Sequence, residues 1–180
     1  VLVTAPAPQA AELLTASPSL SNAAKSVRIT GCWTVMAAFA ERVAVEADGA
    51  FVNGPAETTP LSWIARNGSK PGRPAETAAG DCWVLDGSPA WSEANLELDP
   101  STVIERLLPA FWQATGQPPS KPIYATAHRW RYALPENPLE ESCLADADLR
   151  LYAAGDWCGG PKIEGAFLSG LAAARAMQSE

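Results

Sequence analysis

The chain has 180 residues, enough for one domain or for two small lobes that share a core. Apolar residues make up 47% of it and charged residues 18%, which excludes an intrinsically disordered chain. The formal net charge of −7 is unsuited to a phosphate backbone, so we expect no nucleic-acid partner. No apolar run reaches the roughly 18 residues of a membrane span, so we expect no membrane partner either.

The chain opens on Val1 without a basic-then-apolar signal peptide, which suggests an excerpt of a longer sequence. Its four cysteines form no CxxC pair and it has a single histidine, so we expect no metal site. Two cysteines, Cys32 and Cys82, lie in apolar runs, as is typical of free thiols that act as small hydrophobes. A reduced, cytoplasmic location is the simplest interpretation.

Both ends of the chain carry an α/β pattern. Residues 1–6 predict a short buried strand, and residues 8–14 a short helix with proline in its first turn. At the other end, residues 149–154 predict a strand, residues 155–161 a loop and residues 163–178 an Ala-rich helix. We expect the two end strands to lie side by side in one α/β lobe.

The middle of the chain predicts a separate, mostly antiparallel β lobe. Strands are expected over residues 28–39, 50–53, 61–66, 82–86 and 123–134, with a tight turn near residues 67–73. A helix is expected to begin after Asp99 and to end near Gly116. Residues 135–148 carry five acids, two prolines and little pattern, and are interpreted as a surface connection.

The strand at residues 123–134 carries a distinctive aromatic stripe. Its alternation places on one face Thr126, His128, Trp130 and Tyr132. Such a stripe is usually core, and a lone histidine is more often structural than catalytic. A core role and a pocket role therefore both stay open at this stage.

The segment LRLYAAGDWCGGPKIEGAFLSG at residues 149–170 carries the strongest functional signal. Its strand delivers Asp156 to the edge of a sheet where ligands bind, and Gly155 lets a ligand approach the backbone. The free N–H groups at residues 163–166 favour negative charge at the start of the helix. We expect Gly165 and Ala166 to leave room there for a flat ring.

The string AAGD…GG…EGAFLSG resembles the closing flavin motif of the amine-oxidase superfamily. The resemblance implies FAD as the cofactor, with its ribityl chain held at Gly155 and Asp156. It also implies that the flavin ring lies over Ile163, Glu164, Gly165 and Ala166, whose N–H groups stabilise the charge that appears on reduction.

Three other stretches extend this resemblance over essentially the whole chain. VLVTAPAPQAAELL is similar to the strand that returns to the FAD domain, which implies that Thr4, Ala5 and Pro6 lie near the adenosine end. LSWIARNGSKPGR and HRWRYALP are similar to substrate-domain strands of the renalase-like branch. The resemblance implies three candidates for a catalytic or pocket-wall role, namely His128, Trp130 and Tyr132.

The implied fold class is therefore α/β, with an antiparallel-rich substrate-domain sheet and a partial Rossmann-like FAD-binding lobe built from the two chain ends. Residues 1–20 and 146–180 are assigned to the FAD-binding lobe, and residues 21–145 to the substrate-binding lobe. The implied reaction is hydride transfer to FAD from a small-molecule substrate, either an amine or a reduced nicotinamide, NAD(P)H, with oxygen reoxidising the flavin.

One feature of that family is missing. No GxGxxG follows a strand in these 180 residues, and no acid stands about 20 residues beyond one to bind a ribose. The chain then carries half of a cofactor site, and we expect weak FAD binding and an exposed apolar face that promotes dimerisation. Two alternatives remain: a non-enzymatic remnant or interaction module without flavin, and a half-protein completed by a separate Rossmann chain.

Overall fold

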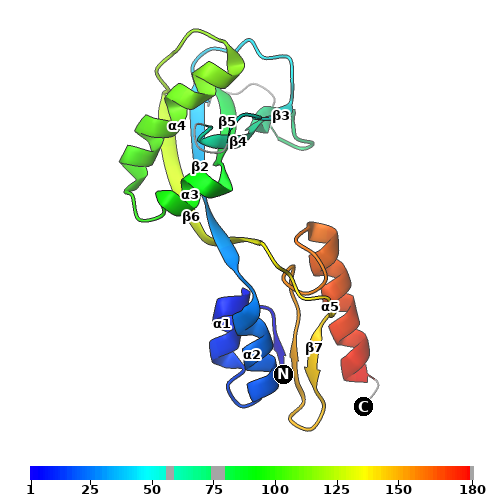
Figure 1. The fold of residues 1–180 in the computed structure, drawn as a ribbon. Coiled ribbons are helices and arrows are strands. Elements are labelled where there is room, and N and C mark those ends of the chain that lie inside the picture. Colours follow the sequence, from blue (N-terminus) through cyan, green and yellow to red (C-terminus); the bar gives the residue numbers. More distant parts are fainter. Residues whose placement is uncertain (56–58, 74–79, 179–180) are drawn as a thin grey trace. The chain divides into compact units, whose positions relative to one another are not determined.

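The structure, a computed structural model, describes residues 1–55, 59–73 and 80–178. The chain divides into two compact units: unit 1 contains Val1–Thr30 and Tyr132–Glu180, and unit 2 contains Gly31–Arg131. Figure 1 labels the elements of each unit. The assignment of a FAD-binding and a substrate-binding role to particular residue ranges stays a prediction.

Unit 1 contains a three-stranded sheet in the order β1-β8-β7. Strand β1 (Leu2–Val3) pairs in parallel with β8 (Leu151–Ala153), and β7 (Leu144–Asp146) pairs antiparallel with the other edge of β8. The two ends of the chain therefore share one sheet, which confirms the α/β lobe expected from their patterns.

Three helices cover this small sheet. Helices α1 (Ala7–Leu13) and α2 (Pro18–Ser26) lie on one side of it, and α5 (Ile163–Gln178) lies on the other (Figure 1). Small side chains of α1 and α2 pack with residues of β7 and β8 in one buried cluster that includes Leu14, Leu20 and Trp157. This packing fixes the loop that follows β8, where the candidate ligand-binding residues lie.

Unit 2 is built on a five-stranded sheet in the order β3-β4-β5-β2-β6. Its strands are β2 (Ile29–Phe39), β3 (Gly49–Phe51), β4 (Leu61–Arg66), β5 (Asp81–Gly87) and β6 (Tyr124–Pro135). The β3–β4, β4–β5 and β5–β2 pairs are antiparallel. The antiparallel-rich sheet predicted from the middle of the sequence is therefore confirmed.

Helix α4 (Pro100–Thr115) covers one face of that sheet and supplies four buried side chains to its core. The carboxylate of Asp99 accepts a hydrogen bond from the backbone N–H of Thr102, and Gly116 ends the helix in the left-handed conformation. Both ends agree with the sequence prediction, because Asp is a good N-cap and glycine adopts positive φ without strain.

Three elements were missed by sequence reasoning. Helix α2 and the short helix α3 (Pro89–Ala94) were not expected, because neither carries a long apolar stripe. Residues 135–148 are not only a surface connection, since they contain β7. A three-residue strand has too little alternation to be recognised, and it forms because β8 provides a partner edge.

Candidate functional site

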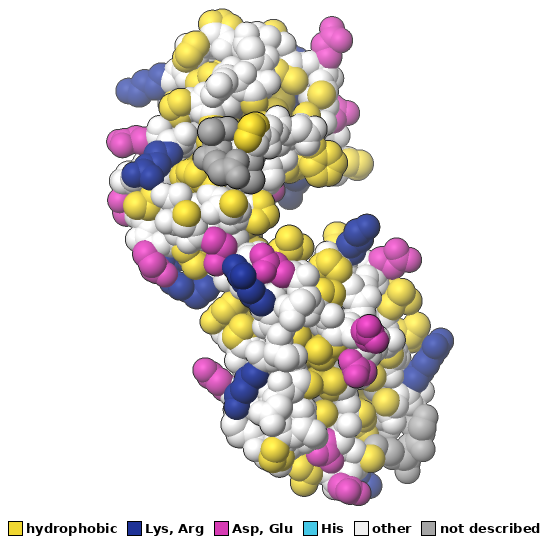
Figure 2. Space-filling view, in the orientation of Figure 1, with side chains coloured by type: hydrophobic (Ala, Val, Ile, Leu, Met, Phe, Trp, Pro, Cys, Tyr) yellow, Lys and Arg dark blue, Asp and Glu magenta, His cyan; other side chains and the backbone are white. Residues whose placement is uncertain are grey.

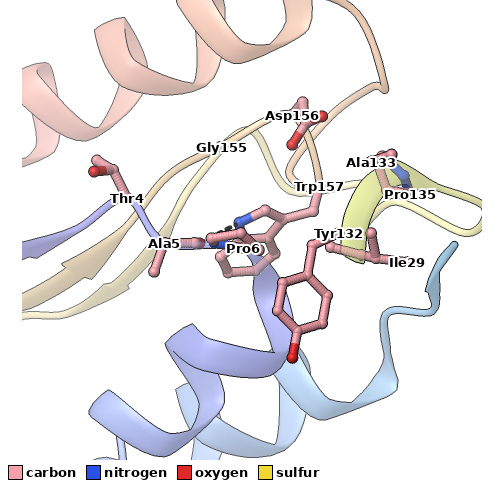
Figure 3. A pocket seen from close by; sticks show the side chains of 10 residues that line it. All are labelled: Thr4, Ala5, Pro6, Ile29, Tyr132, Ala133, Pro135, Gly155, Asp156 and Trp157. Atoms are coloured by element: carbon pink, nitrogen blue, oxygen red, sulfur yellow. Dashed lines mark hydrogen bonds between the residues drawn. The ribbon is translucent and has the colours of Figure 1, made fainter. Parts of the chain in front are cut away.

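A pocket of about 100 Å³ lies in unit 1, where the chain leaves β1 and β8 (Figure 3). Its walls come from four short segments that are distant in sequence. The lining residues are Thr4, Ala5, Pro6, Ile29, Tyr132, Ala133, Pro135, Gly155, Asp156 and Trp157. The structure thus brings together six of the residues predicted from sequence, namely Thr4, Ala5, Pro6, Gly155, Asp156 and Tyr132.

The loop after β8 makes a compact turn. The backbone N–H of Gly155 donates to Ser169 Oγ at 3.0 Å, and the carbonyl oxygen of Gly155 accepts from the N–H of Cys158 at 3.0 Å. A Cβ at position 155 would lie 2.6 Å from Trp157 Nε1, so this position requires glycine. The sequence predicted close approach of a ligand at Gly155, whereas the neighbour in contact is the chain's own indole.

The side chain of Asp156 projects from this turn. It is half-buried, and its carboxylate has no hydrogen bond or ion pair with any residue that the structure describes. A carboxylate in this state can accept hydrogen bonds from hydroxyl groups of a ligand. Asp156 also lines a shallow hollow at the start of α5, together with Lys162, Ile163 and Glu164.

The first turn of α5 is open to solvent. Ile163 is 92% exposed, and the first regular hydrogen bond runs from the N–H of Ala166 to the carbonyl of Lys162. The preceding N–H groups lie at the positive end of a helix of 16 residues, where negative charge is favoured by about 0.3–1 kcal/mol. Three of the four predicted ring-facing residues, Ile163, Glu164 and Ala166, line the hollow beside Asp156.

The prediction that Gly165 leaves room for a flat ring is wrong. A Cβ at position 165 would clash with the backbone carbonyl of Gly160, so the space in front of this glycine is filled by the chain's own loop. Gly165 therefore allows the Gly159–Gly160 turn to pack on the helix and does not open space for a flat ring. The side of the first turn on which Gly165 lies therefore packs against the backbone of Gly160.

The aromatic stripe of β6 is not core. Trp130 is 53% exposed and Tyr132 38% exposed, and His128 is exposed as well. The His128 and Trp130 rings meet edge to face with centroids 4.3 Å apart. Of the three candidates only Tyr132 lines the pocket with Asp156, and its hydroxyl points away from that carboxylate (Figure 3). His128 and Trp130 belong to unit 2.

The thiol nearest the site is unreactive. Cys158 is fully buried, and burial raises the pKa of its thiol to about 12. It therefore stays protonated at neutral pH and is not a nucleophile. No group of His, Cys, Asp or Glu side chains in residues 1–55, 59–73 and 80–178 could hold a metal ion.

Trp157 is the residue of the site that sequence reasoning missed. It was visible as the aromatic side chain directly after Asp156, but nothing in its spacing indicated what it contacts. In the structure it is 1% exposed and its Nε1–H donates to the carbonyl of Ala5 at 3.1 Å. Such a contact between positions 152 residues apart depends on the β1–β8 pairing and cannot be inferred from local sequence.

The fold is shared with solved structures of oxidases. The chain is similar to a protein named as a protoporphyrinogen oxidase from Exiguobacterium sp. 255-15, with a TM-score of 0.70 and 18% identity over 100% of this chain and 41% of that one. It is also similar to cyclohexylamine oxidase from Brevibacterium oxydans IH-35A, with a TM-score of 0.68 and 11% identity over 99% of this chain and 42% of that one. At these identities the likeness establishes the fold.

A family model described as "Flavin containing amine oxidoreductase" matches residues 1–178. The chain therefore belongs to this flavin-containing family, and the resemblance to the amine-oxidase superfamily is confirmed. The chain spans about two fifths of the length of the two solved structures named above. Within its described residues, no helix has the length and apolar character needed to cross a membrane.

The residues present fit part of a flavin. An unpartnered carboxylate at Asp156 suits the hydroxyl groups of a ribityl chain, and the open first turn of α5 suits an electron-rich ring edge. The same residues offer no Gly-rich turn for a diphosphate, because the sequence contains no GxGxxG.

Proposed function

We propose that this chain contributes the ring-facing and substrate-facing part of an FAD-dependent oxidoreductase. The proposed reaction takes a hydride from an amine or a reduced nicotinamide, with oxygen as the final acceptor. The observation that carries this proposal is the unpartnered Asp156 carboxylate beside the open first turn of α5, in a chain of the flavin-containing amine oxidoreductase family.

Bound FAD would supply the hydride and oxygen chemistry. The protein's part is to bind and orient. Asp156 accepts hydrogen bonds from ribityl hydroxyls, and the backbone N–H groups of Ile163 and Glu164 stabilise negative charge at the ring edge. Thr4, Ala5 and Pro6 line the same pocket as Asp156 and would contact the cofactor toward its adenosine end.

The substrate side is proposed to use the exposed aromatic face of β6. The side chains of His128 and Trp130 form an edge-to-face pair, and both remain exposed in the part of the chain that the structure describes. Exposed aromatic rings of this kind provide flat apolar walls for a small-molecule substrate. We assign His128 and Trp130 a wall role, because within the described residues no carboxylate pairs with His128 to prepare it as a base.

The exposed surface of helix α5 indicates that part of the proposed site is missing from this chain. Its outer face carries exposed apolar side chains at Ile163, Phe167, Leu168 and Leu171. Figure 2 likewise shows hydrophobic side chains lying between isolated charged ones on this view of the molecule. Apolar surface of this extent on a helix needs a cover. We propose that a nucleotide-binding domain covers it in the assembled enzyme, and that in its absence copies of this chain associate through it.

A non-enzymatic remnant is the second candidate, because the phosphate-binding GxGxxG is absent from this sequence. Titration of the 180-residue chain with FAD, FMN and ADP-ribose, followed by flavin absorbance, separates the two. We expect weak binding of FAD and FMN with affinities within about twofold of each other, and no competition by ADP-ribose, because the sequence has no Gly-rich turn to hold the diphosphate of the adenosine half.

Two results would contradict this account. FAD binding about a hundredfold tighter than FMN would mean that the adenosine half is held after all, and the site would be complete. No binding of either flavin at millimolar concentration would favour the remnant.

A further inference from the structure

Trp157 joins the two ends of the chain. Its indole is 1% exposed and donates through Nε1–H to the carbonyl oxygen of Ala5 at 3.1 Å, the bond drawn as a dashed line in Figure 3. Its own carbonyl oxygen accepts from the N–H of Leu139 at 2.9 Å. The residue is therefore held through both its side chain and its backbone.

Asp156 lies between two such held residues. On one side, the N–H of Gly155 is fixed by Ser169 Oγ at 3.0 Å, and the indole of Trp157 lies against the α-carbon of Gly155. On the other side is Trp157 itself. The Asp156 carboxylate has no partner in the described part of the chain, so its direction is set by these neighbours and not by bonds of its own.

We propose that Trp157 is a positioning residue for Asp156. The bond from its indole to Ala5 fixes the turn after β8 against the turn after β1, and this holds the Asp156 carboxylate where it could accept a hydrogen bond from a ribityl hydroxyl. The inference rests on the proposed function, in which Asp156 accepts a hydrogen bond from the flavin. Ser169 holds the same turn from the side of α5.

The test is a double-mutant cycle on the affinity of the 180-residue chain for FMN. Trp157→Phe keeps an aromatic ring but removes the indole N–H together with part of the buried ring system, a loss of ring atoms that the Trp33→Phe control shares. We expect it to weaken FMN binding roughly three- to tenfold, the effect of one neutral hydrogen bond. In the Asp156→Ala background the same change is expected to weaken binding by less than about twofold, because the group that Trp157 positions is gone.

Trp33→Phe is the matched control. Trp33 is 2% exposed and its Nε1–H also donates to a backbone carbonyl, that of Asn95 at 3.0 Å, but it lies in unit 2. We expect it to leave FMN affinity unchanged. Amide hydrogen exchange gives a readout without flavin: Trp157→Phe is expected to speed exchange at Asp156 and Cys158, and Trp33→Phe is not.

The outcomes separate the inference from the proposed function. If the native chain binds no FMN, or Asp156→Ala leaves its affinity unchanged, the proposed function fails and the inference with it. If Asp156→Ala weakens binding and Trp157→Phe does not, only the inference is overturned. Equal losses in both backgrounds would overturn it too, because they indicate a general structural role. Should Trp157→Phe not fold, Ser169→Ala releases the same turn and is read by the same cycle.

Discussion

Gly165 and Gly170 lie in the same helix but in different surroundings. A Cβ at position 165 would clash with the carbonyl of Gly160, whereas a Cβ at position 170 would have no atom within 4 Å. We predict that Gly165→Ala destabilises the chain by about 1–3 kcal/mol, the usual effect of overpacking. The measurement is the free energy of unfolding from urea denaturation.

Gly170→Ala is the control for that variant. Because alanine loses less conformational entropy on folding and has space here, it is expected to stabilise the chain by about 0.5–1 kcal/mol. Similar effects of the two substitutions, in sign and size, would contradict the view that Gly165 accommodates the Gly159–Gly160 turn.

The core of unit 2 contains a buried ion pair. Arg66 and Asp81 are 3% and 9% exposed, and Arg66 Nη1 lies 2.5 Å from Asp81 Oδ2, which also accepts from Trp83 Nε1 at 2.9 Å. Arg66→Met would leave a buried carboxylate without its countercharge. We predict a loss of about 3–5 kcal/mol in the free energy of unfolding.

The exposed pair between Arg28 and Glu136 provides the comparison, with side chains 67% and 41% exposed. Arg28→Met is expected to change stability by at most about 1 kcal/mol, because water and salt screen exposed pairs. A comparable loss in both variants would show that burial does not set the strength of the Arg66–Asp81 pair.

At the scale of elements, β7 and α2 are joined by a side-chain hydrogen bond. The hydroxyl of Ser17, which precedes α2, donates to Asp146 Oδ2 at 2.5 Å, and the N–H of Leu149 donates to Oδ1 at 3.1 Å. The Ser17 bond, with a smaller part from Leu149, holds the pKa of the Asp146 carboxyl below its ordinary value. Ionised Asp146 therefore stabilises the folded chain.

The pH dependence follows from that direction. The contribution is fully present above the ordinary aspartate pKa of about 3.9 and is lost as the pH falls through the lower pKa of the folded state. We predict that Asp146→Asn is less stable than the native chain at pH 6 and that the difference shrinks by pH 3. The measurement is the urea midpoint of both proteins at both pH values. A stability difference that is the same at pH 6 and pH 3 would contradict the prediction.

Longer elements were predictable from sequence and short ones were not. Strand β2 and helix α4 carry enough apolar periodicity and cap residues to be recognised within a residue or two. By contrast, β7 has three residues and is a strand only because β8 lies beside it. Local pattern cannot predict an element whose stability comes from a partner distant in sequence.

At the scale of the whole molecule, the outer face of α5 is expected to drive association. Phe167 is 69% exposed on that face. We predict that Phe167→Glu lowers concentration-dependent association in sedimentation velocity, because a charge cannot be buried in an apolar contact without cost. Asn22→Glu, which adds the same charge at an exposed site of α2, is expected to leave association unchanged. A purely monomeric native chain would contradict this prediction.

The candidate site was predictable in its residues but not in all of its contacts. The motif around Gly155 and Asp156 and the TAP turn at Thr4–Pro6 identified half of the residues that line the pocket, because both follow strands that deliver residues to one sheet edge. The contact of Gly165 with Gly160 and the bond of Trp157 to Ala5 depend on how loops fold back in three dimensions. Neither has a signature in sequence spacing.

In the proposed function, a flavin ring and its ribityl chain bind at the turn after β8 and the start of α5. An NMR titration of the ¹⁵N-labelled 180-residue chain with FMN tests it most directly, since weak binding is still mapped residue by residue. We predict that amide shifts concentrate at residues 4–6, 155–157 and 163–166 and are lost in Asp156→Ala. Shifts confined to unit 2, or an unchanged pattern in Asp156→Ala, would contradict the placement of the flavin.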